Sequence, residues 1–152
     1  MKPEIRSATD SDRAAIRTLL EGSGLPTEDL ELAAPEFLVA VEDGTLIGAG
    51  ALQRFGAIAL LRSVVVIPEK RGEGCGQQIV VELERAAQKV GIRELVLLTP
   101  TAADFFGRLG YVRIERSGVA GPISDSAEFR SLCPASAVCM SKTLAVRSLR
   151  HA

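Results

Sequence analysis

The segment that most constrains the fold runs from a long apolar stretch through a glycine-rich loop into an amphipathic helix. The apolar stretch covers residues 57–67 and becomes β-branched toward its end. Gly72, Gly74 and Gly76 follow in alternation, and apolar side chains then recur at helical spacing until Gly91. A buried strand that turns directly into a helix presents unpaired backbone N–H groups at the positive end of the helix dipole. The segment therefore predicts a phosphate-binding loop.

Two common phosphate-binding signatures do not fit this loop. No Gly-Lys-Ser or Gly-Lys-Thr sequence completes a P-loop, and the third glycine of a dinucleotide fingerprint is missing. A nucleotide-binding protein of a different chemistry is therefore a remote alternative. The simpler alternative is a tight strand–helix turn whose glycines only allow positive φ.

Length and charge favour a small enzyme built as one domain over residues 1–152. The chain has 18 basic and 19 acidic residues, so its net charge of −1 predicts no nucleic-acid or anionic-membrane partner. No apolar run approaches the roughly 20 residues that span a bilayer. Charge from Lys2 onward argues against a signal peptide, and we expect a cytoplasmic location.

Cysteine and histidine usage narrows the chemistry further. The cysteines are Cys75, Cys133 and Cys139, an odd number that indicates a reducing compartment rather than a disulfide framework. With His151 as the only histidine, we expect no metal site and no Ser-His-Asp or Cys-His catalytic arrangement.

Periodicity and turn residues predict an alternating order of strands and helices. The expected elements are a strand at 4–6, a helix from the Thr9–Asp12 capping box to Leu20, a possible short helix within 26–32, hairpin strands at 37–41 and 45–52, a strand at 57–67, a long helix up to residue 90, a buried strand at 95–98, a short helix at 101–109, and closing strands at 111–115 and 138–142.

The loop Arg71-x-x-Gly74-x-Gly76, preceded by Val66-Ile67-Pro68, resembles the acetyl-CoA diphosphate loop of the GNAT superfamily of acyl-CoA N-acyltransferases. The order of elements is similar to the GNAT fold from end to end. The resemblance implies an α/β fold with a mixed, mostly antiparallel central sheet flanked by helices and splayed around 60–66 and 95–98. It also implies transfer of an acetyl group from acetyl-CoA to a primary amine, by direct attack in a ternary complex.

The same resemblance implies which residues hold acetyl-CoA. The backbone of Val64, Val65 and Val66 would pair with the pantetheine amides like an added strand. The diphosphate would lie on the loop formed by Arg71, Gly72, Glu73, Gly74, Cys75, Gly76 and Gln77. A backbone N–H near Val64 could stabilise the oxyanion.

A second segment, from Thr99 to Tyr111, is similar to the GNAT pattern Asn-x-x-Ala-x-x-Phe-Tyr-x-x-x-Gly-Phe. In the family this helix lines the pantetheine arm, so Thr99 and Phe106 are expected beside the cofactor. Thr99 replaces the usual Asn, and Phe106 replaces the tyrosine that commonly acts as general acid. Because Phe106 has no proton to give, the acid is unassigned. Tyr111 is a weak candidate that we expect to pack in the core instead.

Arg62 and Ser63 interrupt an otherwise apolar strand. A buried charge must be paired or face a cleft, so Arg62, with Ser63, is a candidate for binding a substrate carboxylate and a weak candidate for catalysis. The alternative is a salt bridge that merely satisfies Arg62. The general base is equally open: Glu36, Glu42, Glu73 and Asp104 are candidates, and a water chain is another.

Three segments, Leu60–Ser63, Leu97–Phe106 and Glu128–Ala137, are similar to GNAT proteins associated with arsenic resistance. This resemblance implies a small-molecule amine substrate, an amino acid or an amino-acid-like, arsenic-containing toxin. Cys133 and Cys139 could bind arsenic(III), although ordinary packing is the stronger interpretation. The alternatives are a catalytically silent acetyl-CoA-binding regulatory module and an acetyltransferase of protein N-termini or lysines. A homodimer is possible.

Overall fold

The computed structural model describes residues 3–25, 27–119, 121–124, 126, 129 and 136–145. The chain forms two compact units. The first contains Met1–Gln53 and Leu61–Leu83, and the second contains Arg54–Leu60 and Glu84–Ala152. Strand β4 (Ile58–Val66) and helix α3 (Cys75–Lys89) each run from one unit into the other.

The sheet of the first unit is built from antiparallel neighbours. Strand β1 (Glu4–Ser7) pairs with β2 (Glu36–Glu42), and β2 pairs with β3 (Thr45–Phe55). The β2–β3 connection has φ values of 51° at Asp43 and 77° at Gly44, the left-handed conformation that a tight hairpin turn needs. The predicted hairpin is therefore confirmed.

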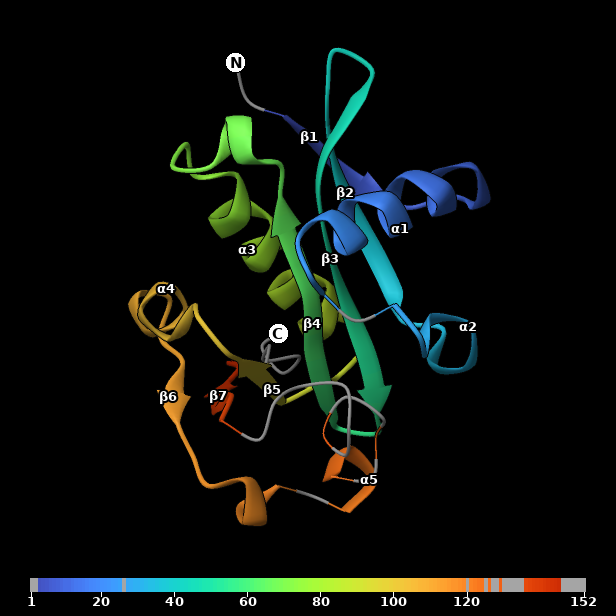
Figure 1. Ribbon diagram of the computed structural model, residues 1–152. Coiled ribbons are helices and arrows are strands. Elements are labelled where there is room, and N and C mark those ends of the chain that lie inside the picture. Colours follow the sequence, from blue (N-terminus) through green and yellow to red (C-terminus); the bar gives the residue numbers. More distant parts are fainter. Residues whose placement is uncertain are drawn as a thin grey trace, which may run out of the picture. The chain divides into compact units, whose positions relative to one another are not determined.

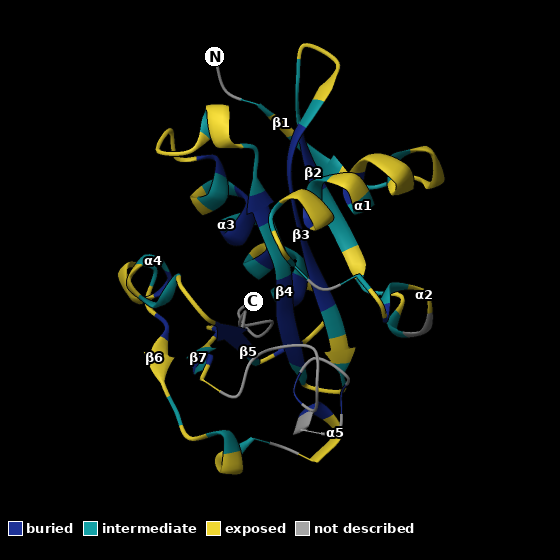
Figure 2. Cartoon of the chain, viewed as in Figure 1, coloured by how far each residue is buried: buried dark blue, intermediate teal, exposed yellow. Residues whose placement is uncertain are grey.

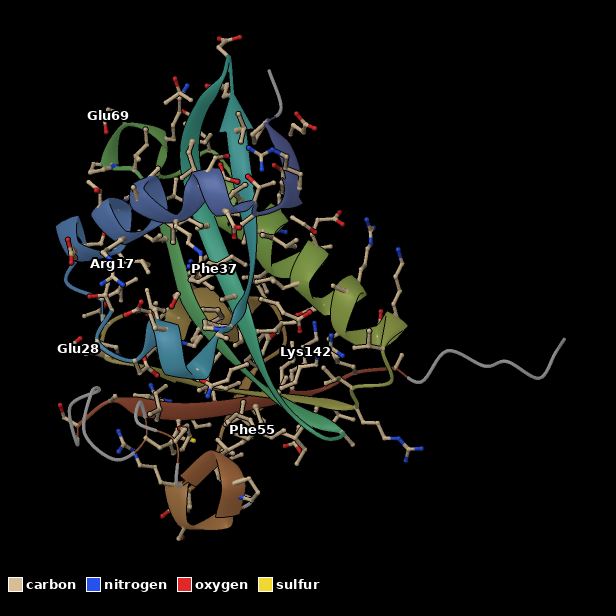
Figure 3. The ribbon with its side chains drawn as sticks, turned by 90° about the vertical axis from the view of Figure 1, so that its right-hand side faces the viewer. Arg17, Glu28, Phe37, Phe55, Glu69 and Lys142 are labelled. Atoms are coloured by element: carbon tan, nitrogen blue, oxygen red, sulfur yellow. The ribbon has the colours of Figure 1, made fainter. Side chains whose placement is uncertain are left out.

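Helices cover both faces of this sheet. Figure 3 shows α1 (Arg13–Gly22) and α2 (Leu30–Ala33) on one face of β2 and β3, with the beginning of α3 on the other. A short 3₁₀ helix, Asp10–Asp12, precedes α1, and the backbone N–H of Thr9 donates to the Asp12 carboxylate at 2.8 Å. Between α1 and the sheet lies a buried cluster of Ile16, Leu20, Val39, Ala49 and Val65.

The second unit joins the first residues of β4 to the C-terminal strands. Strand β5 (Glu94–Thr99) lies parallel to β4 over three register pairs that end at Leu60–Val96. Strand β7 (Val138–Thr143) pairs antiparallel with β5 and with β6 (Val112–Arg113). The remaining elements are α4 (Ala103–Arg108), a 3₁₀ helix (Arg116–Gly118) and α5 (Gly121–Ser124).

Buried apolar side chains hold the second unit together. They form a cluster of Leu60, Val96, Leu98, Ile123, Phe129, Ala137 and Cys139. The dark blue segments in Figure 2 show that much of β3, β4 and β5 is buried. This pattern explains the continuous apolar runs in the sequence, because a strand that is covered on both faces does not alternate with polar residues.

The strand order of the whole sheet is β1-β2-β3-β4-β5-β7-β6 (Figure 1). The predicted α/β class, with a mixed, mostly antiparallel sheet flanked by helices, is thereby confirmed. The described part of the chain holds no helix that is both long and apolar enough to cross a membrane.

The closing part of the chain differs most from the prediction. The strand expected at 111–115 is reduced to Val112 and Arg113. Tyr111 precedes it in the core, where it is 2% exposed and its N–H donates to the Phe106 carbonyl of α4. Helix α2 begins at Leu30 rather than near 26. Helix α5 has no signal in the sequence, since its four residues are too few to show a helical period.

Candidate active site

Ser63 distorts β4 in the middle of the strand. Its φ is +60°, in the left-handed region that side chains other than glycine rarely adopt, and its hydroxyl accepts a hydrogen bond from Arg62 Nε at 3.4 Å. Such a conformation costs of order 1–3 kcal/mol and persists only where the surrounding structure enforces it. The distortion immediately precedes Val64, near which the predicted oxyanion donor, a backbone N–H, is expected.

Beyond Ser63, β4 presents one open edge. The N–H of Ile67 donates to the carbonyl of Ile47 in β3 at 2.9 Å. Because the trans peptide points its two polar groups in opposite directions, the Val66 carbonyl faces away from β3. The register pairs of β4 with β5 end at Leu60, so within the described part of the chain no β5 residue pairs with this edge, which we call the open edge.

The backbone polar groups of successive residues in a strand face opposite edges, so those of the three valines do not all face the same edge. The polar groups of Val64 and Val66 lie on the open edge, and those of Val65 face β3. In agreement, the Val65 carbonyl lies beside Gly48 of β3, 3.0 Å from where a Cβ atom would stand. Of the three predicted backbone contacts, the geometry therefore offers those of Val64 and Val66.

The chain leaves β4 through a short 3₁₀ helix (Pro68–Lys70) and enters the glycine loop. Gly72 and Gly74 have φ values of +83° and +87°, and no atom lies within 4 Å of a Cβ built on either. The first helical bond of α3 runs from the Gln78 N–H to the Gly74 carbonyl at 3.0 Å. The N–H groups of residues 75–77 precede that bond and have no partner within the helix.

This loop fits a diphosphate. The conformations of Gly72 and Gly74 turn the backbone around an open space, which a side chain at either position would fill. The positive end of the helix dipole of α3 points into the same region. Glu73 and Gln77 are exposed beside it, and Gly76 is half-buried. Figure 3 shows Glu69 on the neighbouring turn, also at the surface.

Two cations flank the loop. Lys70 forms an ion pair with Glu42 at the end of β2, and Glu42 raises the pKa of Lys70. Arg71 is exposed, and its Nε donates to the Val66 carbonyl at 3.0 Å. Glu42, one of the general-base candidates, is therefore an ion-pair partner.

The sequence did not reveal how α3 is seated. Ideal Cβ atoms on Gly48 and Gly50 of β3 would stand 2.9 Å and 2.8 Å from Ile79 side-chain atoms, and that of Gly50 2.9 Å from Leu83. Only glycine allows the helix to lie so close to the strand. The available signal was the two glycines at spacing i, i+2, which places them on one face of a strand.

Cys75, the first residue of α3, is a packing residue. It is 4% exposed, and its Sγ lies 3.5 Å from the Cβ position of Gly48. Burial raises the pKa of this thiol, with Glu42 and Glu73 acting in the same direction. Its contribution to the loop is its backbone N–H.

In the second unit, Thr99 and Phe106 shape helix α4. The Thr99 hydroxyl accepts the Ala102 N–H at 2.8 Å and so fixes the turn that leads into the helix. Phe106 is 7% exposed and packs edge-on against Phe105 and Tyr111, with ring centroids 5.0 and 5.6 Å apart. Their predicted contacts with the cofactor remain predictions.

Tyr111 is buried itself and takes part in a partly buried polar network. Its hydroxyl donates to Glu84 at 2.9 Å, and Lys142 donates to both oxygens of that carboxylate at 3.1 Å and to the Leu109 carbonyl at 2.8 Å. Burial, and secondarily Glu84, raise the pKa of Tyr111 far above its usual range. This is the packing role that the sequence favoured over catalysis. Figure 3 labels Lys142.

Arg62 is the main correction to the predicted site. Its guanidinium donates to both oxygens of Asp29 at 2.7 Å and to the Gln53 side chain at 3.1 Å. The side chain of Arg62 is 0% exposed, and that of Asp29 10%. The salt-bridge alternative therefore holds, and the expected substrate clamp is wrong in this structure. Asp29 follows a loop rich in polar residues, which gave no signal of this pairing.

The remaining candidate residues lie at the surface, in the core or outside the described residues. Glu36, Glu73 and Asp104 are exposed, so the general base is still unassigned. Cys139 is buried, which raises the pKa of its thiol, and Cys133 lies outside the described residues. Across the described ranges, the structure gathers no three potential His, Cys, Asp or Glu ligands for a metal.

Residues 33–113, more than half of the chain, match the acetyltransferase (GNAT) domain family. An uncharacterised N-acetyltransferase of Chlorobaculum tepidum is 31% identical over 120 residues, which are 74% of this chain and 77% of that protein. The chain therefore belongs to the GNAT acetyltransferase family.

Other relatives are larger or known by structure. An amino-acid acetyltransferase of Aeromonas salmonicida is 32% identical over 121 residues, but the chain spans only 27% of its length. A Mycobacterium tuberculosis protein solved in complex with CoA has 29% identity and a TM-score of 0.79, over 94% of this chain and 100% of that one. N-acetylglutamate synthase of Neisseria gonorrhoeae reaches 0.82 at 21% identity, over 95% of this chain and 36% of that one, and shows the fold alone.

Proposed function

We propose that this protein is an N-acetyltransferase that moves the acetyl group of acetyl-CoA to the primary amine of a small molecule. The observation that carries the proposal lies within the first unit. The open edge of β4 at Val64 and Val66 leads directly into the glycine loop and the N-terminus of α3. Along the chain, strand-like hydrogen-bonding groups are thus followed by an anion site, which matches the order of pantetheine and diphosphate in CoA. Membership of the GNAT family supports the same assignment.

The chain contributes to catalysis by binding and orientation. The loop N–H groups hold the diphosphate, and the backbone of Val64 and Val66 aligns the pantetheine arm. The Val64 N–H, fixed by the distortion at Ser63, polarises the thioester carbonyl. The amine nitrogen then bonds to the carbonyl carbon while the C–S bond breaks and the released proton neutralises the thiolate. Good orientation alone can supply about 7–11 kcal/mol of the barrier.

The proposed mechanism contains no tyrosine acid. Phe106 has no transferable proton, and the hydroxyl of Tyr111 is committed to Glu84 within the core. Solvent water then relays the proton released by the amine to the departing thiolate. The direct attack needs no covalent intermediate with a protein side chain, which agrees with the raised pKa of the buried Cys75 thiol.

For the acceptor we propose the amine of an amino acid. Support comes from relatives named amino-acid acetyltransferases, such as those of Aeromonas salmonicida and Haemophilus ducreyi, at 32% and 31% identity. Arg62 no longer supports this choice, because its charge is neutralised by Asp29. An arsenic-containing amino-acid analogue is the narrower proposal and rests on the sequence resemblance alone. A homodimer is likewise still a prediction.

The test is a panel of amines incubated with acetyl-CoA and monitored for free thiol. The panel contains the common amino acids, an arsenic-bearing glutamate analogue, polyamines and a short peptide with a free N-terminus and a lysine. Selective turnover of amino acids supports the proposal. Turnover of the peptide alone would identify a protein acetyltransferase. Tight acetyl-CoA binding without turnover of any amine would identify a silent binding module and refute the proposal.

A further inference from the structure

The guanidinium of Arg71 lies on a backbone acceptor within the proposed cofactor site. Its Nε donates to the Val66 carbonyl at 3.0 Å, across five residues of sequence. That carbonyl faces the open edge of β4, because the Ile67 N–H on the same peptide is bonded to β3. Arg71 therefore covers the edge at the last residue of the strand.

A strand-like ligand needs the same position. An amide N–H that pairs with the Val66 carbonyl must place its nitrogen about 2.9 Å from the oxygen, near the plane of the peptide. The Nε of Arg71 already lies at this distance. Although a carbonyl oxygen can accept two hydrogen bonds, the guanidinium and an incoming pantetheine amide would compete for the strand-pairing position in front of this oxygen.

We propose that Arg71 makes binding at this site conditional on a diphosphate, and so selects CoA thioesters against pantetheine thioesters that lack one. The proposal rests on the proposed function, because it assumes that pantetheine runs along β4. A thioester without the diphosphate must displace Arg71 from Val66 and offers the guanidinium nothing in return. A CoA thioester offers it two phosphate groups beside the glycine loop.

The exchange of the Val66 carbonyl for a phosphate as the hydrogen-bond acceptor of Arg71 is energetically favourable. A guanidinium–phosphate contact joins two opposite charges and can be bidentate, so it is stronger than the single hydrogen bond of the same guanidinium to a neutral carbonyl. A ligand that binds only when the guanidinium has left Val66 has its apparent affinity reduced by the fraction of molecules in which the oxygen is accessible. For one exposed hydrogen bond the penalty is roughly two- to ten-fold.

Lys70 provides the matched control. It is the neighbouring cation of the same loop, but its ammonium pairs with Glu42, away from the edge of β4. Replacing Lys70 removes one positive charge from the loop region without removing a donor from the Val66 carbonyl. The two variants therefore separate general electrostatics from competition at that oxygen.

The experiment measures dissociation constants by calorimetry for acetyl-CoA and for acetyl-pantetheine, with wild type, Arg71→Met and Lys70→Met. We expect Arg71→Met to weaken acetyl-CoA binding roughly ten-fold or more and to tighten acetyl-pantetheine binding by roughly two- to ten-fold. We expect Lys70→Met to leave acetyl-pantetheine binding within about two-fold of wild type. Circular dichroism checks that both variants are folded, and Arg71→Gln serves as the second variant.

The proposal predicts that Arg71→Met changes the affinities for acetyl-CoA and for acetyl-pantetheine in opposite directions, so the result is decisive. Unchanged or weaker binding of acetyl-pantetheine to both Arg71 variants would overturn the proposal, as would equal tightening in Lys70→Met. Neither result concerns turnover, so each leaves the proposed function standing if wild type binds acetyl-CoA and acetylates an amine. Failure of wild type to bind acetyl-CoA would instead remove both proposals.

Discussion

Removing Arg62 should destabilise the protein far more than it changes recognition of the amine. Arg62→Met leaves the Asp29 carboxylate, whose side chain is 10% exposed, without its two hydrogen bonds of 2.7 Å. At a charge separation of ~4 Å and an effective dielectric constant of 20, the lost attraction is about 4 kcal/mol. Stranding one partner of a buried pair costs about 3–5 kcal/mol, a large part of the total stability of an ordinary domain.

The assay is urea unfolding followed by far-ultraviolet circular dichroism, since the chain has no tryptophan. In a double-mutant cycle with Asp29→Asn, the double variant should lose less stability than the two single variants lose in sum. The control is Arg13→Met, which removes an exposed ion pair with Asp10 and should cost less than about 0.5 kcal/mol.

The reasoning would be refuted by a specific combination of results. If Arg62→Met lost less than about 1 kcal/mol of stability while the KM of the amine rose ten-fold or more, the buried ion pair would not describe Arg62 in solution. The guanidinium would then have to be reassigned to the substrate carboxylate. A KM for acetyl-CoA and a KM for the amine that rise together would indicate general structural damage instead.

Three further variants test the site. Gly50→Ala should destabilise the protein by roughly 1–3 kcal/mol in urea unfolding, because its Cβ would stand 2.8 Å from an atom of α3. Gly22→Ala, with open space around it, should not destabilise the protein. Equal effects of the two substitutions would contradict the close packing of α3 on β3. Gly74→Glu should abolish measurable acetyl-CoA binding in calorimetry, and Gly74→Gln should weaken it less, since only Glu adds a negative charge; unchanged affinity in Gly74→Glu would remove the loop from the cofactor site. Tyr111→Phe should leave the pH dependence of kcat/KM unchanged while costing about 1 kcal/mol of stability from the lost bond to Glu84; an acid limb that disappears in this variant would make Tyr111 the general acid.

Local patterns in the sequence were enough to predict the framework of the cofactor site. The hairpin at Asp43-Gly44, the buried strand that ends near residue 66 and the helix that follows Gly74 were all predicted from turn chemistry and periodicity. These features depend on neighbours in sequence. A glycine that turns a strand into a helix serves the same purpose wherever the element lies in the fold.

Contacts between distant segments could not be predicted in this way. Arg62 and Asp29 are 33 residues apart, and Glu84 and Lys142 are 58 residues apart. The sequence correctly indicated that a charge at Arg62 needs a partner, but a cleft-bound substrate and a carboxylate from another segment satisfy that need equally well. Only the fold brings Asp29 to β4 and decides between them.

The glycines of β3 and Arg71 of the loop also show which features follow from local sequence and which depend on contacts between distant segments. Composition alone does not distinguish Gly48 and Gly50 from glycines that weaken a strand, because their purpose is visible only when α3 lies against them. Arg71 was assigned to the loop by its resemblance to the GNAT diphosphate loop, yet its contact with the Val66 carbonyl depends on how the chain folds back over the edge of β4. The sequence by itself thus determined which backbone segments form the site, whereas the tertiary structure decided which side chains pair with them, because pairing depends on distances that no local pattern encodes.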